Sequence, residues 1–146
     1  IIEDLRAAYP ERKIDTHLEQ YDVILGDATE LHSAVSNLVV NALKYSGHDD
    51  LVTVEWKLDA GFPTLTVRDE GEGIKPQHIP RLTERFYRVD KSRSQATGGT
   101  GLGLAIVKHV AVSHNAELLI DSVYGQGSVF SMVFKPHQKG TQAALQ

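Results

Sequence analysis

The strongest constraint on the fold is a predicted amphipathic helix that carries two asparagines, Asn37 and Asn41, on its polar side. Asp27 and Glu30 have the spacing of a capping box, which predicts where this helix begins, and we expect it to end near Gly47. Helical spacing predicts a core-facing stripe of Leu31, Val35, Leu38 and Ala42. With about 3.6 residues per turn, roughly a third of the circumference holds Asn37, Asn41, Lys44 and Tyr45. Asparagine is a mediocre helix former, so two in mid-helix call for an explanation, with a solvated helix face as the alternative.

The other hydrophobic patterns predict a single domain that mixes helices and short strands. At 146 residues the chain is long enough to bury its own core. Further helices are expected over residues 1–9, 76–84 and 102–114. Strands, with hairpins at the first and last pairs, are expected over residues 12–19, 21–25, 51–58, 62–68, 117–123 and 128–134. We expect the chain to divide into the end of a preceding helix or linker, the domain itself and a disordered tail, over residues 1–11, 12–135 and 136–146.

Composition narrows the functional classes. A formal net charge of −4 argues against general nucleic-acid binding. The absence of cysteine excludes disulfides and thiol chemistry, which suits a cytosolic setting. No apolar run approaches the roughly 20 residues that cross a bilayer, so we expect this chain to be soluble, whether or not a longer parent is membrane-bound.

A carboxylate is predicted at the rim of the core, at the end of the strand over residues 62–68. Period-two alternation places Leu65, Val67 and Asp69 on one side of that strand. A partly buried acid needs a hydrogen-bond donor, which the exocyclic amine of adenine supplies and the carbonyl of guanine does not. Gly71 and Gly73 allow the backbone to turn tightly beside such a base. A plain Asp-Gly turn is the alternative interpretation.

Three groups of residues are suited to phosphate and Mg²⁺. The carboxamide of Asn41 is a candidate Mg²⁺ ligand, while Lys44 offers an ammonium group to phosphate. Residues 81–93 carry five basic and two acidic side chains, a local excess of +3, although a solvated charged surface would look the same. The glycine-rich residues 98–103 lead into a helix whose free amides can bind phosphate. They lack a preceding strand and a Gly-Lys-Ser/Thr sequence, which argues against Rossmann and P-loop sites, and residues 88–100 are expected to form a mobile lid.

Taken in order, these motifs resemble the catalytic ATP-binding domain of sensor histidine kinases, in the wider family that includes gyrase-type and chaperone ATPases. The resemblance covers about residues 12–135 and rests on an N box, a first glycine box, an F box and a second glycine box, at residues 37–45, 69–73, 85–90 and 99–104. Gly125, Gly127 and Ser128 resemble the closing glycine hairpin of the family. Residues 80–91 further resemble the phosphate-regulon sensor kinases. The resemblance implies an α+β fold, a two-layer sandwich with helices packed on one face of a mixed sheet.

The resemblance also implies a site for ATP and Mg²⁺. Asn41 would hold the metal, Asn37 would support the phosphate end, and Asp69 would read adenine. Tyr45 would lie beside the base or ribose, and Phe86 would anchor the lid by packing. The implied catalytic residues are Asn37, Asn41, Lys44 and Arg88. The implied nucleotide-contacting residues are Asn37, Asn41, Lys44, Tyr45, Asp69, Gly71, Gly73, Ile74, Phe86, Tyr87, Arg88, Gly99, Thr100, Gly101, Leu102, Gly103, Leu104 and Ser128.

The residue at position 37 bears on the type of reaction. In the gyrase-like branch a glutamate in the place of Asn37 activates water, and asparagine has no comparable basicity. Transfer of the γ-phosphoryl group to a histidine is therefore favoured over hydrolysis. No histidine of this chain lies in the family's acceptor pattern, so the acceptor is expected on a separate dimerisation domain, with onward transfer to a response regulator.

The sequence leaves three other functions open. A self-sufficient ATPase, a nucleotide-binding module without catalysis and a related serine-kinase branch are the competing functions. We expect the isolated domain to be monomeric and cytoplasmic, and its parent to be a homodimer in the bacterial inner membrane.

Overall fold

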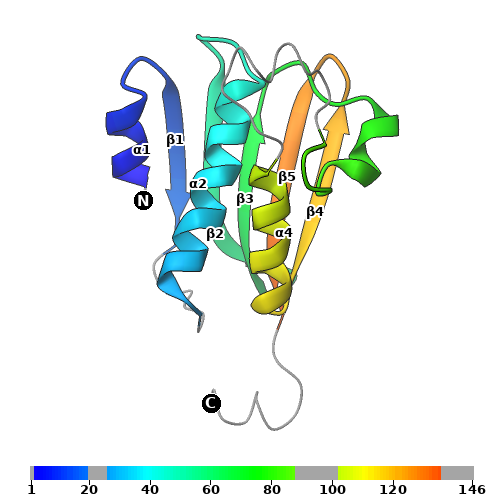
Figure 1. Ribbon diagram of the computed structural model, residues 1–146. Helices are drawn as coiled ribbons and strands as arrows, with labels where there is room; N and C mark the ends of the chain where they lie inside the picture. The colour runs from blue at the N-terminus through cyan, green and yellow to red at the C-terminus, as the bar shows by residue number, and fades with distance from the viewer. Residues whose placement is uncertain (1, 20–25, 88–101, 136–146) are drawn as a thin grey trace, which may run out of the picture.

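The computed structural model describes residues 2–19, 26–87 and 102–135 (Figure 1). Its elements are α1 (Ile2–Ala8), β1 (Lys13–Leu18), α2 (Ala28–Lys44), β2 (Leu51–Asp59), β3 (Phe62–Asp69), the 3₁₀ helix η1 (Pro76–Arg81), α4 (Gly103–Ser113), β4 (Ala116–Val123) and β5 (Gly127–Phe134). The five strands form one sheet in the order β1-β2-β3-β5-β4, with β1 and β2 parallel and the other pairs antiparallel. Helices α2 and α4 lie side by side on one face of the sheet (Figure 1). The predicted α+β sandwich with helices on one face is confirmed.

Helix α2 begins where the capping box predicts, because the Asp27 carboxylate accepts the Glu30 amide hydrogen at 2.9 Å. The Glu30 side chain does not complete the box, since its carboxylate accepts from Ser113 Oγ of α4 at 3.0 Å. The Asp27 amide donates to His114 Nε2, also at 3.0 Å. These two contacts fix the start of α2 against the end of α4.

The buried stripe of α2 differs from the predicted one. Leu38 and Ala42 are buried as expected, but Leu31 and Val35 are only half-buried. The fully buried side of the helix holds Ala34, Leu38, Val39, Ala42 and Leu43. Helix α4 packs beside α2, and Leu31 and Val35 pack against the edge of the shared core.

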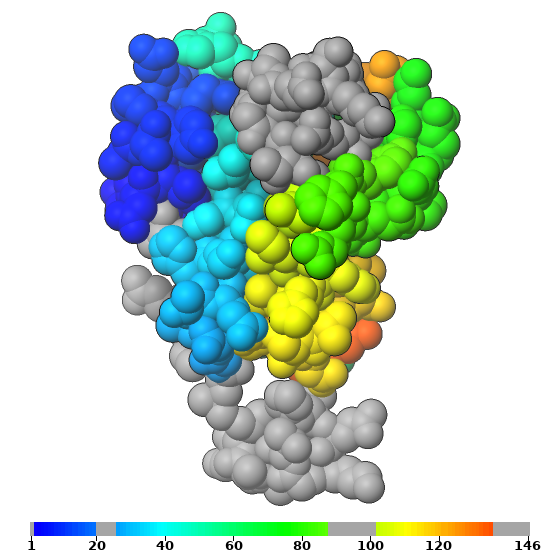
Figure 2. Space-filling model, in the orientation of Figure 1, coloured from blue at the N-terminus to red at the C-terminus, as the bar shows by residue number. Residues whose placement is uncertain are grey.

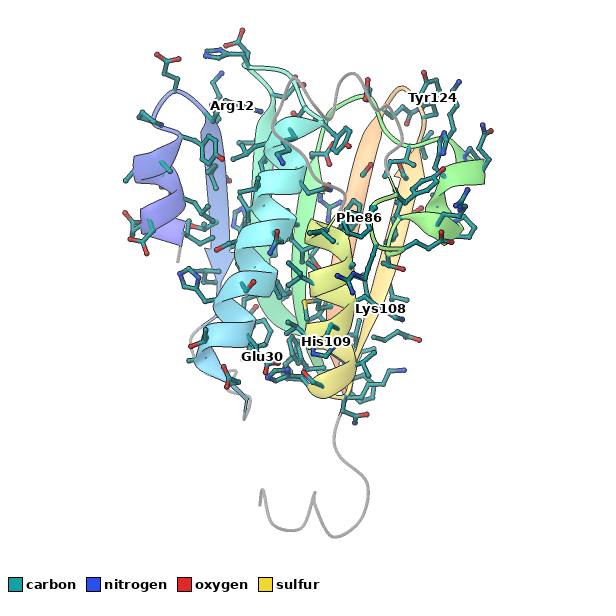
Figure 3. All side chains as sticks on the ribbon, in the orientation of Figure 1. Arg12, Glu30, Phe86, Lys108, His109 and Tyr124 are labelled. Atoms are coloured by element: carbon teal, nitrogen blue, oxygen red, sulfur yellow. The ribbon has the colours of Figure 1, made fainter. Side chains whose placement is uncertain are left out.

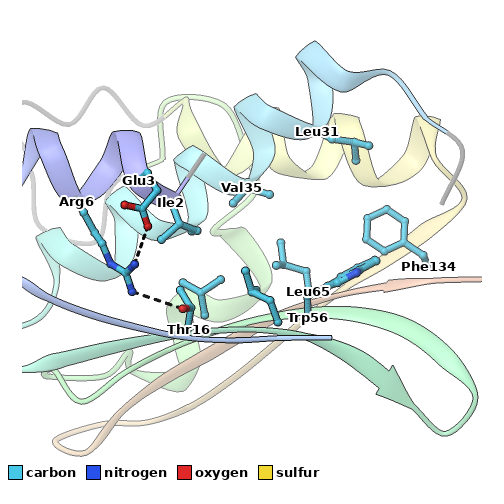
Figure 4. Close-up of a pocket in the computed structure, with 11 residues that line it drawn as sticks. Ile2, Glu3, Arg6, Thr16, Leu31, Val35, Trp56, Leu65 and Phe134 are labelled. Carbon is cyan, nitrogen blue, oxygen red and sulfur yellow. Dashed lines mark hydrogen bonds and ion pairs between the residues drawn. The ribbon is translucent and has the colours of Figure 1, made fainter. Parts of the chain in front are cut away.

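Leu31 and Val35 instead line an apolar pocket of about 470 Å³ between α1, α2 and the sheet (Figure 4). Its other apolar walls are Ile2, Leu18, Val54, Trp56, Leu65 and Phe134. Arg6 lies at the rim, where its guanidinium donates to the Ile14 carbonyl at 2.9 Å and to Glu3 at 2.9 Å.

The end of α2 is held from a distant part of the chain. The helix ends at Lys44, short of Gly47, because its last carbonyls are satisfied by side chains. Ser46 Oγ donates to the Ala42 carbonyl at 2.7 Å. The Arg12 guanidinium donates to the Leu43 carbonyl at 2.8 Å and to Ser46 Oγ at 2.8 Å (Figure 3 labels Arg12).

The two antiparallel hairpins follow the predicted strands. Ala60 and Gly61, at the turn between β2 and β3, have φ values of 53° and 86°, as a tight two-residue turn requires. In the hairpin of β4 and β5, Phe130 and Met132 are buried beneath the helices. The expected strand over residues 21–25 and the expected lid over residues 88–100 lie outside the described residues. Among the described strands, β1 pairs in parallel with β2.

Within the described ranges, none of the helices combines the length and hydropathy needed to cross a bilayer.

Candidate functional site

The carboxylate of Asp69 lies buried at the end of β3, with only 5% of the residue exposed. Leu65 and Val67 are buried on the same side of the strand, which confirms the alternation predicted from the sequence. Burial raises the pKa of the Asp69 carboxyl from 3.8 to about 6, and hydrogen bonds from the backbone amides of Gly71 and Ser128 lower it in part. The Gly71 amide lies 2.9 Å from Asp69 Oδ1. The site therefore contains a desolvated acceptor that gains from a further donor.

This raised pKa predicts a pH dependence of stability. Between pH 3.8 and about 6 the folded chain retains the Asp69 proton that the unfolded chain has lost, so the free energy of unfolding falls as pH rises through this window. We expect this group to lower stability by up to about 3 kcal/mol between pH 4 and pH 7. Urea unfolding at several pH values measures this slope. The same series on Asp69→Asn is the control, and identical slopes in the two proteins would contradict the assignment.

The turn after Asp69 is built by close backbone approaches. A Cβ atom on Gly71 would lie 2.0 Å from the Tyr45 carbonyl oxygen, and one on Gly73 would lie 2.3 Å from the Val123 carbonyl oxygen. Gly73 also has a φ of 73°. The Glu72 amide donates to the Tyr45 carbonyl at 3.3 Å. The turn is thereby wedged between the end of α2 and the end of β4.

Ser128 lies opposite Asp69 in the pairing of β3 with β5 and is 5% exposed. Its hydroxyl lies 2.8 Å from the hydroxyl of Ser122, which also accepts the Ile74 amide at 2.8 Å. Ser122 was missed by the sequence prediction, although alternation along β4 places it on the inward side. The carboxylate and the two hydroxyls line one end of the site.

The asparagine face of α2 lies at the start of α4. Asn37 Nδ2 donates to the Ser33 carbonyl at 2.8 Å, and a Cβ atom on Gly103 would lie 2.9 Å from Asn37 Oδ1. The structure thus brings together two predicted site residues that are 66 positions apart. The side chains of Asn41 and Lys44 are half-buried and have no hydrogen-bond partner among the described residues. As far as the described residues show, both side chains can therefore bind a ligand.

The segment after η1 differs from its expected packing. Phe86 is 65% exposed, has a φ of 68°, and carries the Arg85 guanidinium 5.6 Å from its ring centre (Figure 3). The anchoring contact expected for Phe86 is therefore not seen among the described residues. Tyr87 is half-buried, with its hydroxyl bonded to His78 Nδ1 and the Arg81 guanidinium over its ring at 4.5 Å.

The remaining predicted site residues divide into two groups. Leu102 and Leu104 are half-buried at the start of α4, and Ile74 is 9% exposed after the acidic turn. Four predicted residues lie outside the described ranges: Arg88, Gly99, Thr100 and Gly101. In space-filling view α2 and α4 form one continuous surface, with residues 76–87 at its side (Figure 2).

Comparisons with known proteins agree with this architecture. Residues 26–138 match the family described as histidine kinase-, DNA gyrase B- and HSP90-like ATPase. The phosphate regulon sensor protein PhoR of Pseudomonas aeruginosa is 55% identical over 113 residues, which cover 77% of this chain and 26% of that protein. The chain thus spans about a quarter of the length of the curated relatives that it matches.

Two solved structures share the fold. The mycobacterial sensor histidine kinase MprB superposes with a TM-score of 0.75 at 30% identity, over 91% of this chain and 87% of that one. Full-length ShkA in complex with AMPPNP superposes with a TM-score of 0.72 at 26% identity, over 91% of this chain and 27% of that one. The chain therefore belongs to the histidine kinase-, DNA gyrase B- and HSP90-like ATPase family, in its sensor histidine kinase branch.

Proposed function

We propose that this chain binds Mg²⁺-ATP and transfers the γ-phosphoryl group to a histidine on a separate dimerisation and phosphoacceptor domain, for onward transfer to a response regulator. The observation that carries this proposal is the buried Asp69 carboxylate, flanked by the tight glycine turn and by Ser128. Its raised pKa reflects desolvation, which a donor from a bound base would offset.

The adenine end of the site consists of hydrogen-bond acceptors. Asp69 would accept from the 6-amino group of adenine, whereas a guanine carbonyl at that position would face the carboxylate without a hydrogen. Gly71 lets the backbone of the turn pass close to the Tyr45 carbonyl, which would hold the turn beside the bound base. The AMPPNP complex of the structural neighbour ShkA supports a nucleotide as ligand for this fold.

The phosphate end would be formed by the polar side of α2. The Asn41 carboxamide oxygen would hold Mg²⁺, and the Lys44 ammonium would contact phosphate oxygens. Bound Mg²⁺ supplies charge neutralisation at the phosphates. Asn37 is fixed by its hydrogen bond to Ser33 and lies against Gly103, so it would orient the phosphate end rather than remove a proton. Arg88 remains a proposed phosphate contact outside the described residues.

Phosphoryl transfer to a positioned acceptor depends mainly on alignment and charge stabilisation, and neither requires a general base from this chain. A carboxamide at position 37 does not activate water. This favours transfer over hydrolysis. The names of the relatives, which are sensor proteins and sensor histidine kinases, support a role in two-component signalling. We also propose that the parent protein is a homodimer bound to the membrane, with this domain on its cytoplasmic side.

The central experiment incubates the purified chain with Mg²⁺ and γ-labelled ATP, with and without a separately purified phosphoacceptor domain of the Pseudomonas aeruginosa relative. We expect acid-labile, alkali-stable label on that domain and no steady phosphate release in its absence. An acceptor domain with its histidine replaced by glutamine is the control. Steady phosphate release by the chain alone would favour an ATPase, and nucleotide binding without any transfer would favour a module without catalysis.

Replacing Asn41 by alanine is expected to remove mainly the Mg²⁺-dependent part of ATP affinity, because the proposed ligand oxygen is lost while the adenine end stays intact. We expect about a tenfold loss with Mg²⁺ and little change in EDTA. Calorimetry under both conditions measures this difference. Ser36→Ala, on the same helix, is the matched control. An equal loss with and without Mg²⁺ would show that Asn41 is not the ligand.

A further inference from the structure

The hydroxyl of Ser122 connects three segments around the adenine end of the site. Ser122 lies on β4 opposite Ser128 on β5. Its Oγ lies 2.8 Å from the Ile74 amide nitrogen, 3.0 Å from the Gly127 carbonyl oxygen and 2.8 Å from Ser128 Oγ. The Ser122 hydroxyl is therefore the shared hydrogen-bond partner of Ile74, which follows the acidic turn, and of Gly127 and Ser128 in β5.

These three contacts fix the direction of the bond between the two serines. A serine hydroxyl has one hydrogen and two lone pairs. The Ile74 amide can only donate, and the Gly127 carbonyl can only accept. Ser122 therefore uses one lone pair for Ile74 and its hydrogen for Gly127. The remaining contact is a hydrogen bond only if Ser128 donates to Ser122.

The hydrogen of Ser128 is thereby committed, and its Oγ presents only lone pairs to any other group. Ser128 is directly opposite Asp69, and its backbone amide donates to the Asp69 carboxylate. The carboxylate and the hydroxyl then form two neighbouring acceptors with no hydrogen of their own. An amino group at position 6 of a purine offers two hydrogens to such a pair, whereas a carbonyl at that position offers none.

We propose that Ser122 is a positioning residue that determines base specificity: by accepting the Ser128 hydrogen, it keeps Ser128 an acceptor, so that the site selects purines with a 6-amino group. This inference rests on the proposed nucleotide function. Without the Ser122 hydroxyl, the Ser128 hydrogen can turn towards the Asp69 carboxylate or towards a 6-carbonyl group. Either change weakens the preference for the amino group.

The test measures the affinities of the full chain for ADP and for inosine diphosphate, which carries a carbonyl at position 6. We expect the wild-type chain to prefer ADP, and Ser122→Ala to reduce the ratio of the two affinities roughly fivefold. In a Ser128→Ala background, Ser122→Ala is expected to leave the ratio unchanged, because no hydroxyl remains to be directed. Ser131→Ala is the matched control, since Ser131 lies on β5 but pairs with Thr66 instead.

A purely structural role for Ser122 predicts another result. Equal losses of affinity for ADP and inosine diphosphate, or the same change of ratio in the Ser128→Ala background, would overturn the proposal. If Ser122→Ala does not fold, Ser122→Thr and Ser122→Cys replace it. The threonine variant keeps the hydroxyl and is expected to keep the ratio, whereas the cysteine variant is expected to lower it, and the reverse order would contradict the proposal. Failure of the wild-type chain to bind ADP at all would refute the proposed function itself.

Discussion

Asp69→Ala is expected to reduce the affinity for ADP at least about a hundredfold while the chain remains folded. The wild-type carboxylate is desolvated and accepts two backbone amides, and its remaining lone pairs gain from a further donor. Removal deletes the acceptor for the 6-amino group and leaves those amides without their partner. Calorimetry with ADP measures the loss, and circular dichroism checks the fold.

Two variants sharpen this prediction. Asp69→Asn keeps the shape and one acceptor oxygen but presents an amide hydrogen, so ADP affinity is expected to fall while stability at pH 7 rises. Asp121→Ala removes an exposed carboxylate from β4 and is expected to leave ADP affinity unchanged. Unchanged ADP affinity in Asp69→Ala would refute the assignment of the adenine site.

Gly71→Ala is expected to lower the free energy of unfolding by about 2–4 kcal/mol and to weaken nucleotide binding strongly. The added methyl group would lie 2.0 Å from the Tyr45 carbonyl oxygen and 2.8 Å from Ser46 Cα. Both neighbours are backbone at the end of α2, where Arg12 holds Ser46 in place. The turn must therefore move away from the helix and carry Asp69 with it. Urea unfolding and ADP calorimetry measure the two effects.

Gly61→Ala is the matched control for Gly71→Ala. Gly61 has a φ of 86°, but an added Cβ atom would meet nothing within 4 Å. Its substitution costs only the backbone strain of a left-handed residue, about 1 kcal/mol, and should not affect ADP. Equal losses in the two variants would show that the contact of Gly71 with the end of α2 does not explain the result.

Local sequence patterns predicted most of the helices and strands. They also predicted those features of the site that depend on a single helix or strand. The start of α2 follows from the Asp27 carboxylate within the same turn, and the burial of Asp69 follows from strand alternation. Contacts between elements were not predictable in this way. Leu31 and Val35 pack at the edge of the core, where they line the pocket beside α1. The alternation of β1 and of β2 does not indicate that these two strands pair with each other.

Two contacts around the site were not predictable for the same reason. Arg12 reaches α2 across 31 residues, and the approach of Gly127 to Asp69 joins segments 58 positions apart. A periodic pattern of apolar residues does not show which residues far apart in the chain come into contact. The anchoring role expected for Phe86 stays a prediction, because the lid residues that it would contact lie outside the described ranges, and Phe86 itself is 65% exposed.

The wedging of the acidic turn has a thermodynamic consequence. Gly71, Gly73 and Gly127 each place backbone against backbone, with no flexible side chain between the surfaces. Such a turn has few alternative conformations to lose when a base arrives, so docking of the base carries a small entropic penalty. The proposed adenine end is therefore preorganised, and we expect the binding energy gained there to be available for aligning the phosphates.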